Sequence, residues 1–355
     1  MLSHRLFNDT IQPTIAPASV TVLPASVFAI KQSGIEVETQ GGSRVRLSSS
    51  KAPILSAGQM DALAQSGAVT VPFPEMCFGS NSLRVAVRGL VIGVDAVRAL
   101  ASVQTSSEAM DSIKVAFAKE WTEKSEKLHG KIKQIERPYD WTYTPKNYCG
   151  TLGFEDGQSG ESDPRSFVET TERIDVDMLK RNEPILWYDE VVLYEDELAD
   201  NGACMLTARV RVMPSCFLIL LRFFLRVDNV LFRIHDTRIF HAFDSPHILR
   251  EYSTRECNYA RVLARVPAAG GLMHAAWSGA GGGGASGLRG ARSGGGGTTG
   301  TSGMDLSLLN KPDWVAAGMV DPIGVNVYLG PRGSEESEVI VDGVKVCVWR
   351  DQLIL

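Results

Sequence analysis

The stretch from Arg211 to Arg238 contains the run CFLILLRFFL (216–225), in which nine of ten residues are apolar and only Arg222 interrupts them. A strand with one face in water alternates polar and apolar residues, so this run is too apolar for such a strand. At ten residues it is also about half the ~20 that a membrane-spanning helix needs. The run therefore belongs in a folded core. Asp228 and Asn229 tolerate positive φ and precede a second β-like run, so the sequence predicts an antiparallel hairpin.

Composition limits the kinds of partner that the chain can have. With 355 residues, 44% hydrophobic and 22% charged, the chain has the size of about two domains or of one large domain with insertions. Its net charge of −5 provides no general attraction for nucleic acid or for an anionic membrane. The expected partners are therefore other proteins or small molecules.

The cysteines and the N-terminal residues bear on the compartment. Six cysteines are scattered along the chain without any C-x-x-C pair, and the first residues lack the continuous apolar segment of a secretory signal. Both observations favour reduced thiols in a reducing compartment. We expect a protein of the cytoplasm, and also of the nucleus.

Four regions differ in composition. Residues 1–24 are predicted to be a flexible N-terminal tail, and residues 25–266 to be the main domain. Residues 267–303 are dominated by Gly, Ser and Ala. Such a segment cannot bury enough apolar area to order itself, so we predict a disordered insertion. Residues 304–355 regain β-like patterns and are expected to pack on the main domain.

Within the main domain, short strand patterns outnumber helix patterns. A helix is expected just before Gly67, a second after Asp95 as its N-cap, and a third over residues 107–128. Alternation in TARVRVM (207–213) sends Arg209 and Arg211 to the same, outward face. The fold class predicted from these patterns is α+β, a mainly antiparallel sheet or sandwich core with peripheral helices.

Two groups of residues are candidate catalytic sites. His235 and Asp236 form the adjacent pair that metal-dependent phosphohydrolases use, and His241 lies on the same face of a strand as His235. Those enzymes hold their ligands on helices, so a surface histidine on a strand is favoured. A metal-dependent hydrolase that uses His235, Asp236 and His241 remains the alternative function. The acidic run 195–197 is better explained as a strand end that enters an exposed loop. We expect no enzymatic activity and no cofactor.

Six arginines lie on strands that are predicted to be neighbours. They are Arg209, Arg211, Arg222, Arg226, Arg233 and Arg238. Together they would form a cationic patch suited to acidic side chains or to a chain-terminal carboxylate. They could equally pair with acidic residues on neighbouring strands, and the sequence leaves both interpretations open.

Several long motifs resemble the TIPRL family, the TOR-signalling-pathway-regulator-like proteins related to yeast Tip-forty-one. The blocks occur in the family's order and cover roughly residues 50–260. They are PEMCFGSN (74–81), RPYDWTY (137–143), GTL (150–152), TTERID (170–175), EVVLYEDEL (190–198), the stretch 211–238 and LREYSTRE (249–256). The Gly-rich segment and residues 304–355 do not follow the family's pattern.

The resemblance implies a non-enzymatic regulator that binds the catalytic subunit of type-2A-family protein phosphatases. It implies that the subunit's C-terminal tail is captured in a cleft, that activity is restrained, and that the protein acts in TOR signalling. An alpha-four-type phosphatase-binding protein is a further implied partner.

The family's phosphatase-contacting positions match Asp95, Ile174, Ile234 and Asp236 in this sequence. For Asp95 and Asp236, exposure is expected. For Arg222 and Arg226 we add our own hypothesis, that they meet the carboxylate of the tail. Each of the four matched positions also has a structural explanation: a helix cap for Asp95, a core position for Ile174, an inward strand position for Ile234 and a turn for Asp236.

Overall fold

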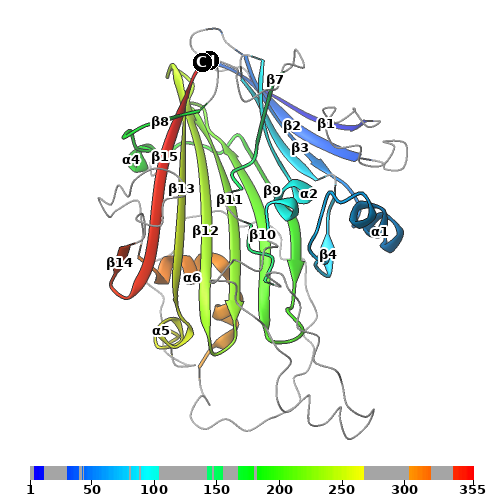
Figure 1. Ribbon diagram of the computed structural model, residues 1–355. Coiled ribbons are helices and arrows are strands. Elements are labelled where there is room, and N and C mark those ends of the chain that lie inside the picture. The colour runs from blue at the N-terminus through cyan, green and yellow to red at the C-terminus, as the bar shows by residue number, and fades with distance from the viewer. Residues whose placement is uncertain are drawn as a thin grey trace, which may run out of the picture.

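Two antiparallel sheets make up most of the described structure. The computed structural model describes residues 4–11, 30–39, 42, 44–79, 81–87, 89–103, 142–145, 148–154, 167–179, 182–267, 304–320 and 339–355. One sheet has six strands and the other has nine. They diverge from the end at which the C-terminus lies, and short helices lie around them (Figure 1). The predicted α+β class, with a mainly antiparallel core and peripheral helices, is confirmed.

The six-stranded sheet is built from the N-terminal half of the chain. Its order is β1 (His4–Ile11), β2 (Ile30–Glu38), β3 (Arg44–Lys51), β5 (Ser82–Val87), β6 (Leu90–Asp95) and β7 (Thr151–Phe154). The sequence places β1 in a flexible tail, whereas in the structure it pairs with β2 along its whole length. Without β1, β2 would be an exposed edge, and an unpaired edge tends to recruit another strand.

The nine-stranded sheet contains the apolar run. Along its main path lie β14 (Val339–Val341), β15 (Val344–Ile354), β13 (His247–Asn258), β12 (Leu231–Ala242), β11 (Cys216–Val227), β10 (Gly202–Val212), β9 (Trp187–Asp196) and β4 (Met76–Cys77), while β8 (Val168–Glu169) pairs with β15. The predicted hairpin is β11 and β12. Val227 pairs with Leu231, so the turn includes Val230 as well as the two expected turn residues Asp228 and Asn229, and Asn229 adopts a φ of 60° there.

The helices are short and peripheral. They are α1 (Ala57–Gln65), α2 (Ala96–Ala101), α4 (Val176–Leu179), α5 (Tyr259–Leu263), the 3-10 helix η2 (Leu306–Asn310) and α6 (Pro312–Gly318). Gly67, with a φ of 71°, follows α1 as expected. The helix predicted over residues 107–128 and the disorder predicted over 267–303 lie outside the described residues. In the part of the chain that is described, the helices are all too short or too polar to cross a membrane.

Both faces of β11 are covered, which explains why its sequence is apolar almost throughout. Phe217, Ile219, Leu221 and Phe223 point toward the six-stranded sheet and share a core with residues such as Leu47. The alternate residues point to the opposite side, where η2 and α6 pack over Phe224 and its neighbours. We call the side toward the six-stranded sheet the inner face and the opposite side the outer face.

The segment after the Gly-rich region contributes to this same sheet. β15 pairs with β13 over ten residue pairs, from His247 with Ile354 to Glu256 with Lys345. Asp342 and Gly343 connect β14 to β15 with φ angles of 48° and 68°. Positive φ at both positions is the two-residue hairpin geometry that an Asp-Gly pair favours.

Candidate functional site: the outer face of the nine-stranded sheet

A network of charged side chains crosses the outer face at the middle of the sheet. Register places Thr207, Arg222, Asp236 and Ser253 in one row across four neighbouring strands. Because side chains alternate between the faces of a sheet, all of these point outward with Arg222. The charged members of the network are Glu190, Arg209, Arg222, Asp236, Arg238, Glu251, Arg255, Asp313 and Arg350.

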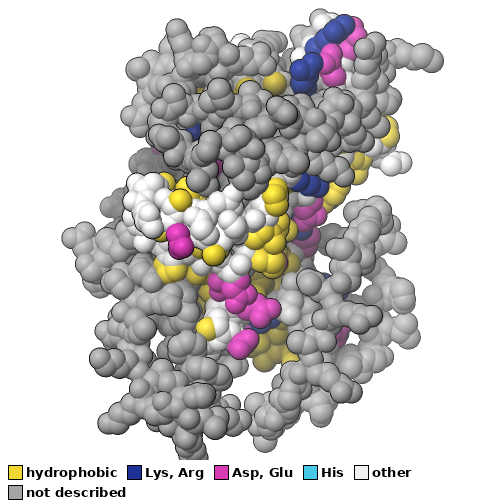
Figure 2. All heavy atoms as spheres, turned by 90° about the vertical axis from the view of Figure 1, so that its right-hand side faces the viewer, with side chains coloured by type: hydrophobic (Ala, Val, Ile, Leu, Met, Phe, Trp, Pro, Cys, Tyr) yellow, Lys and Arg dark blue, Asp and Glu magenta, His cyan; other side chains and the backbone are white. Residues whose placement is uncertain are grey.

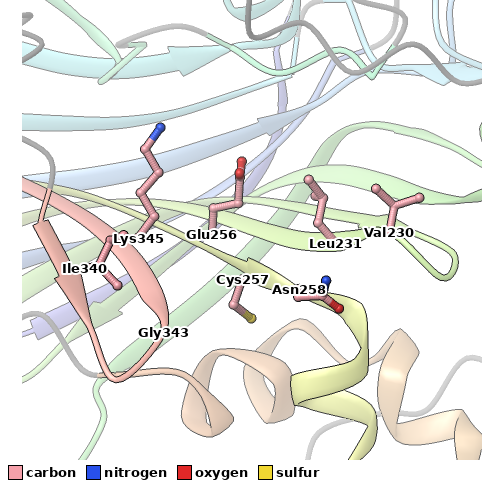
Figure 3. A pocket seen from close by; sticks show the side chains of 8 residues that line it. All are labelled: Val230, Leu231, Glu256, Cys257, Asn258, Ile340, Gly343 and Lys345. Carbon is pink, nitrogen blue, oxygen red and sulfur yellow. The ribbon is translucent and has the colours of Figure 1, made fainter.

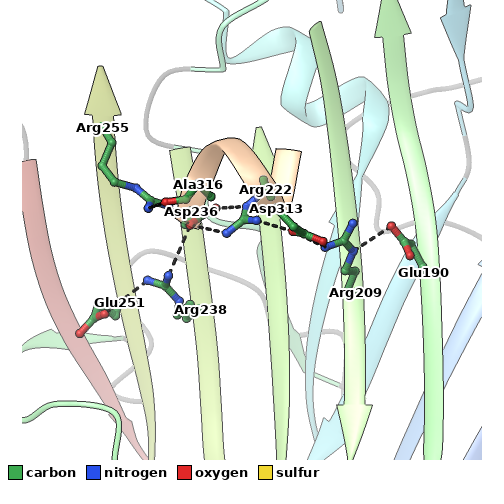
Figure 4. A network of polar contacts seen from close by, with 9 residues as sticks. All are labelled: Glu190, Arg209, Arg222, Asp236, Arg238, Glu251, Arg255, Asp313 and Ala316. Carbon is green, nitrogen blue, oxygen red and sulfur yellow. Dashed lines mark hydrogen bonds and ion pairs between the residues drawn. The ribbon is translucent and has the colours of Figure 1, made fainter. Parts of the chain in front are cut away.

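Asp236 lies at the centre of the network and is fully buried. Arg222 donates two hydrogen bonds to its carboxylate, from Nε to Oδ1 at 2.7 Å and from Nη2 to Oδ2 at 2.9 Å. Arg255 donates to Oδ2 at 2.5 Å, and Arg238 lies 3.4 Å from the same atom (Figure 4). Burial alone would raise the pKa of Asp236, but the surrounding guanidinium groups outweigh it and hold this pKa well below its ordinary value.

The helix α6 adds a carboxylate from above the sheet. Asp313 accepts hydrogen bonds from Nη1 of Arg209 at 2.7 and 2.8 Å, and from Nη1 of Arg222 at 2.5 Å. Arg255 donates from Nη1 to the carbonyl oxygen of Ala316 at 3.1 Å. Figure 4 shows α6 lying across the strands with these groups beneath it. The helix is therefore held to the sheet by arginines as well as by its apolar side.

A second buried pair extends the network toward β15. Arg350 donates from Nε to Oε2 of Glu251 at 2.7 Å, and both side chains are almost fully buried, at 2% and 1% exposed. Arg238 lies between Glu251 and Asp236 and reaches both carboxylates. Such buried charges are tolerated only when each finds a partner.

Toward β9 the outer face is left partly uncovered. Tyr188, Arg211 and Leu218 form one row across three strands, next to the row of Glu190, Arg209 and Leu220. Leu218 and Leu220 are only half-buried, Arg211 is exposed, and Tyr188 is 46% exposed. We call Tyr188, Arg211, Leu218 and Leu220 the open strip. It combines apolar area with the exposed guanidinium group of Arg211, next to the arginines that bind Asp313.

Comparison with known proteins identifies the family. Residues 76–263, just over half of the chain, match the TIP41-like family. The chain belongs to the TIP41-like family. It is 40% identical over 225 residues to the TIP41-like proteins of Homo sapiens and Rattus norvegicus, which covers 63% of this chain and 78% of each relative. It is 35% identical over 236 residues to "Type 2A phosphatase activator TIP41" of Saccharomyces cerevisiae, covering 62% of this chain and 63% of that protein. The resemblance predicted from the motifs is confirmed.

The four positions carried over from the TIP41-like family do not form one exposed surface. Ile234 is fully buried beneath α6, and Asp236 is the buried centre of the network. Ile174 is 2% exposed in a small cluster with Phe240 and Leu249 on the outer face. The expected exposure of Asp236 is wrong, because three arginines and α6 enclose it.

Asp95 stands apart from the other three positions. It ends β6 in the six-stranded sheet and caps α2, where its Oδ1 accepts a hydrogen bond from the backbone N–H of Arg98 at 3.0 Å. The predicted helix cap is confirmed. Burial raises the pKa of Asp95 to about 6, although the Arg98 backbone bond and the charges of Arg98 and Arg84 act to lower it.

The predicted cationic patch is only partly assembled. Arg222 joins the network, while Arg226 pairs with Asp228 at the β11–β12 turn, with an Nε–Oδ1 distance of 2.7 Å. Arg233 lies on the inner face and pairs with Glu256. Pairing with local acids, the second interpretation of these residues, is what the structure shows for most of them. Arg211 retains the exposed position that a patch requires.

The metal-site alternative does not assemble. His235 and Asp236 are consecutive on β12 and so point to opposite faces, and His241 lies six residues along the strand from His235, a separation of roughly 20 Å. His235 is not a surface residue as predicted: it packs between Phe223 and Tyr252, and burial lowers its pKa to about 3. Across the described ranges, His, Cys, Asp and Glu side chains nowhere gather in threes with metal-binding geometry.

A cavity and a group of acidic side chains lie away from the charged network. A cavity of about 310 Å³ lies at the ends of β12, β13 and β15, lined by Val230, Leu231, Glu256, Cys257, Asn258, Ile340, Gly343 and Lys345. It is shallow, and its Cys257 points away from Glu256 and Lys345 (Figure 3). Acidic side chains also gather on the side of the molecule shown in Figure 2. The role of Asp196 is structural, because it accepts a hydrogen bond from the backbone N–H of Glu75 and another from that of Leu198.

The site residues that the sequence analysis missed come from distant parts of the chain. Asp313, Arg255, Glu251 and Arg350 carried no signal that would connect them to Arg222. Asp313 is 91 residues from Arg222, and Arg350 is 99 residues from Glu251. The pairing of β13 with β12 brings Glu251 and Arg255 beside Asp236. The packing of η2 and α6 adds Asp313, and the pairing of β15 adds Arg350.

Proposed function

We propose that this protein is a non-enzymatic regulator that binds the catalytic subunit of a type-2A-family protein phosphatase through the outer face. Membership of the TIP41-like family supports a phosphatase partner, because two relatives carry the name type 2A phosphatase activator. The observation that carries the choice of surface is the open strip. It is a partly apolar, cationic part of a sheet whose outer face is covered by η2 and α6 around Phe224 and Ile234.

The C-terminal tail of the phosphatase subunit is the proposed occupant of the open strip. An extended peptide laid across β9, β10 and β11 would meet Leu218 and Leu220 with apolar side chains and Arg211 with a carboxylate. Arginine binds a carboxylate through two parallel hydrogen bonds, which makes it the appropriate residue for a terminal carboxylate. Arg222 and Arg226 remain proposed contacts, although both are engaged by carboxylates of this chain.

The direction of regulation is a separate part of the proposal. We propose restraint of the phosphatase, although the relatives in Saccharomyces cerevisiae and Schizosaccharomyces pombe are named activators. The rate of substrate dephosphorylation by the purified subunit, measured with increasing amounts of this protein, decides between the two. A role in TOR signalling, an alpha-four-type partner and a cytoplasmic location complete the proposal.

Binding of the purified chain to a type-2A catalytic subunit, with and without the last residues of that subunit, tests the proposal. Arg211→Ala is expected to weaken binding about tenfold or more to the intact subunit, and to have little effect with the shortened subunit. Arg44→Ala is the matched control, because it removes an exposed arginine from the six-stranded sheet, where its side chain is 71% exposed. No binding to the intact subunit, or equal losses in the two variants, would contradict the proposal.

A further inference from the structure

We propose that α6 is an internal competitor for the partner's acidic segment, with Asp313 occupying the place that a partner carboxylate takes on Arg209 and Arg222. This inference rests on the proposed function and adds a mode of regulation to the same face. In this arrangement the helix closes the arginine network when the protein is alone. When the partner binds, its carboxylate replaces Asp313 and α6 moves off the sheet.

Asp313 is much more exposed to solvent than the two arginines that it binds, as expected of a group that a partner's carboxylate can replace. The side chain of Asp313 is 53% exposed, whereas those of Arg209 and Arg222 are 20% and 9% exposed. A half-exposed carboxylate keeps part of its contact with water in the bound position, so its departure costs less than the departure of a fully buried carboxylate would. The two arginines are part of the sheet and stay in place. Asp313 is therefore the mobile partner in this pair.

The charge count of the outer face also points to exchange. Five arginines belong to the network, namely Arg209, Arg222, Arg238, Arg255 and Arg350, but the sheet itself supplies only Glu190, Asp236 and Glu251 as carboxylates. Among the described residues, Nη2 of Arg350 has no hydrogen-bond acceptor. Buried arginines without enough carboxylates are costly. A carboxylate from outside the sheet is needed, and Asp313 and a partner's acidic residue can each provide it.

The segment formed by η2 and α6 makes apolar contacts with the sheet through a small number of residues. Val315 and Ala316 of α6 and Leu309 of η2 pack on Phe224 and Ile234. With seven residues in α6 and five in η2, the segment is short. Small peripheral elements of this kind open with much lower free energies than the core of a sheet. Release of α6 therefore leaves the two sheets and their shared core intact.

The open strip leads directly to Asp313. Leu220 of the strip is the register partner of Arg209, which is the arginine that Asp313 binds with both carboxylate oxygens. A peptide bound along the strip thus ends or continues beside α6. If the peptide carries a carboxylate one or two residues beyond the open strip, that carboxylate meets the same guanidinium groups as Asp313. The peptide carboxylate and Asp313 then compete for one site.

Asp313→Asn is the first test, because it removes the competing charge and keeps the size of the side chain. Binding to the intact catalytic subunit is expected to become about fivefold tighter, since the population with a free arginine site increases. Glu256→Gln is the control. It removes the same charge from an arginine–carboxylate pair of comparable length on the inner face of the same sheet, and it should leave binding unchanged. Equal tightening in both variants would show a general charge effect and overturn the inference.

Hydrogen exchange of the wild-type protein gives a second test that needs no variant. Backbone amides of α6 should exchange faster when the catalytic subunit is bound, whereas amides of β11 and β12 should stay protected. If α6 is equally or better protected in the complex, the helix does not leave and the inference is wrong. Absence of any binding by wild-type and Asp313→Asn protein would instead contradict the proposed function, so the two failures are distinguishable.

Discussion

The two faces of the nine-stranded sheet are made by the same strands but are stabilised differently. The inner residues of β11 are apolar and bury against the six-stranded sheet, namely Phe217, Ile219, Leu221, Phe223 and Leu225. The outer residues are mixed, namely Leu218, Leu220, Arg222, Phe224 and Arg226. Apolar packing depends on volume and shape, while a buried ionic network depends on every charge having a partner. The inner face therefore maintains the fold, and the outer face is the one whose contacts can be exchanged.

The largest expected effect comes from truncation on the inner face. Phe223→Ala removes a ring that is 1% exposed and packs against His235. The resulting cavity should lower the free energy of unfolding by about 4 kcal/mol, measured by urea denaturation. Leu220→Ala, on the half-buried outer side of the same strand, should cost less than half as much. Equal losses of unfolding free energy in the two variants would mean that the inner face does not contribute more to stability than the outer face.

Asp236→Asn is expected to have the next largest effect, about 3 kcal/mol, because it leaves Arg222, Arg238 and Arg255 without their buried carboxylate. The pKa of Asp236 is depressed in the folded state. Its ionised form therefore stabilises the fold above the unfolded pKa of about 3.9, and this contribution is lost as the pH falls toward the folded pKa. The difference in the free energy of unfolding between wild type and Asp236→Asn should therefore be smaller at pH 3 than at pH 7, as measured by chemical denaturation. A difference independent of pH would argue against a charge-based role.

Asp95→Asn should shift stability in the opposite direction. The pKa of Asp95 is raised to about 6 by burial, so the stability that its protonated form contributes is lost as the pH rises through about 6. Asparagine is also a good N-cap. The variant should gain about 1 kcal/mol relative to wild type between pH 4 and pH 8, measured by thermal unfolding. Weaker phosphatase binding by this more stable variant would establish Asp95 as a contact; unchanged binding would limit it to capping α2.

The smallest expected effect concerns the segment that carries Ile174. His247 lies 2.9 Å from Glu172, a residue whose side chain is 54% exposed. Exposed pairs of this kind contribute little, so Glu172→Gln should lower the free energy of unfolding by about 0.5 kcal/mol or less. Ile174→Ala, which truncates a buried residue of the same segment, should cost several times more. Chemical denaturation of the two variants side by side measures this difference.

Local signals predicted local structure well. The turn at Asp228 and Asn229 and the apolar run located the hairpin, and Asp95 before a helix pattern located a cap, because both depend on neighbouring residues only. The Arg222–Asp236 pair was within reach too, since the two residues lie nearly equidistant from the turn of the predicted hairpin. The sequence could not supply Asp313 or Arg350, because their positions depend on how distant segments pack. Successive side chains of a strand point to opposite faces, which separates His235 from Asp236. The metal-site alternative relied on the adjacency of these two residues in sequence and did not take this alternation into account.

The position of β15 has a consequence for how the protein is made. Glu251 on β13 is buried against Arg350 on β15, yet ribosomes add residues at about 5–20 per second, so roughly ten seconds pass between the synthesis of the two strands. During that interval β13 is an open edge, and Glu251 lacks its partner Arg350. Because β13 and β15 are far apart in sequence, we expect their pairing to be a slow step late in folding.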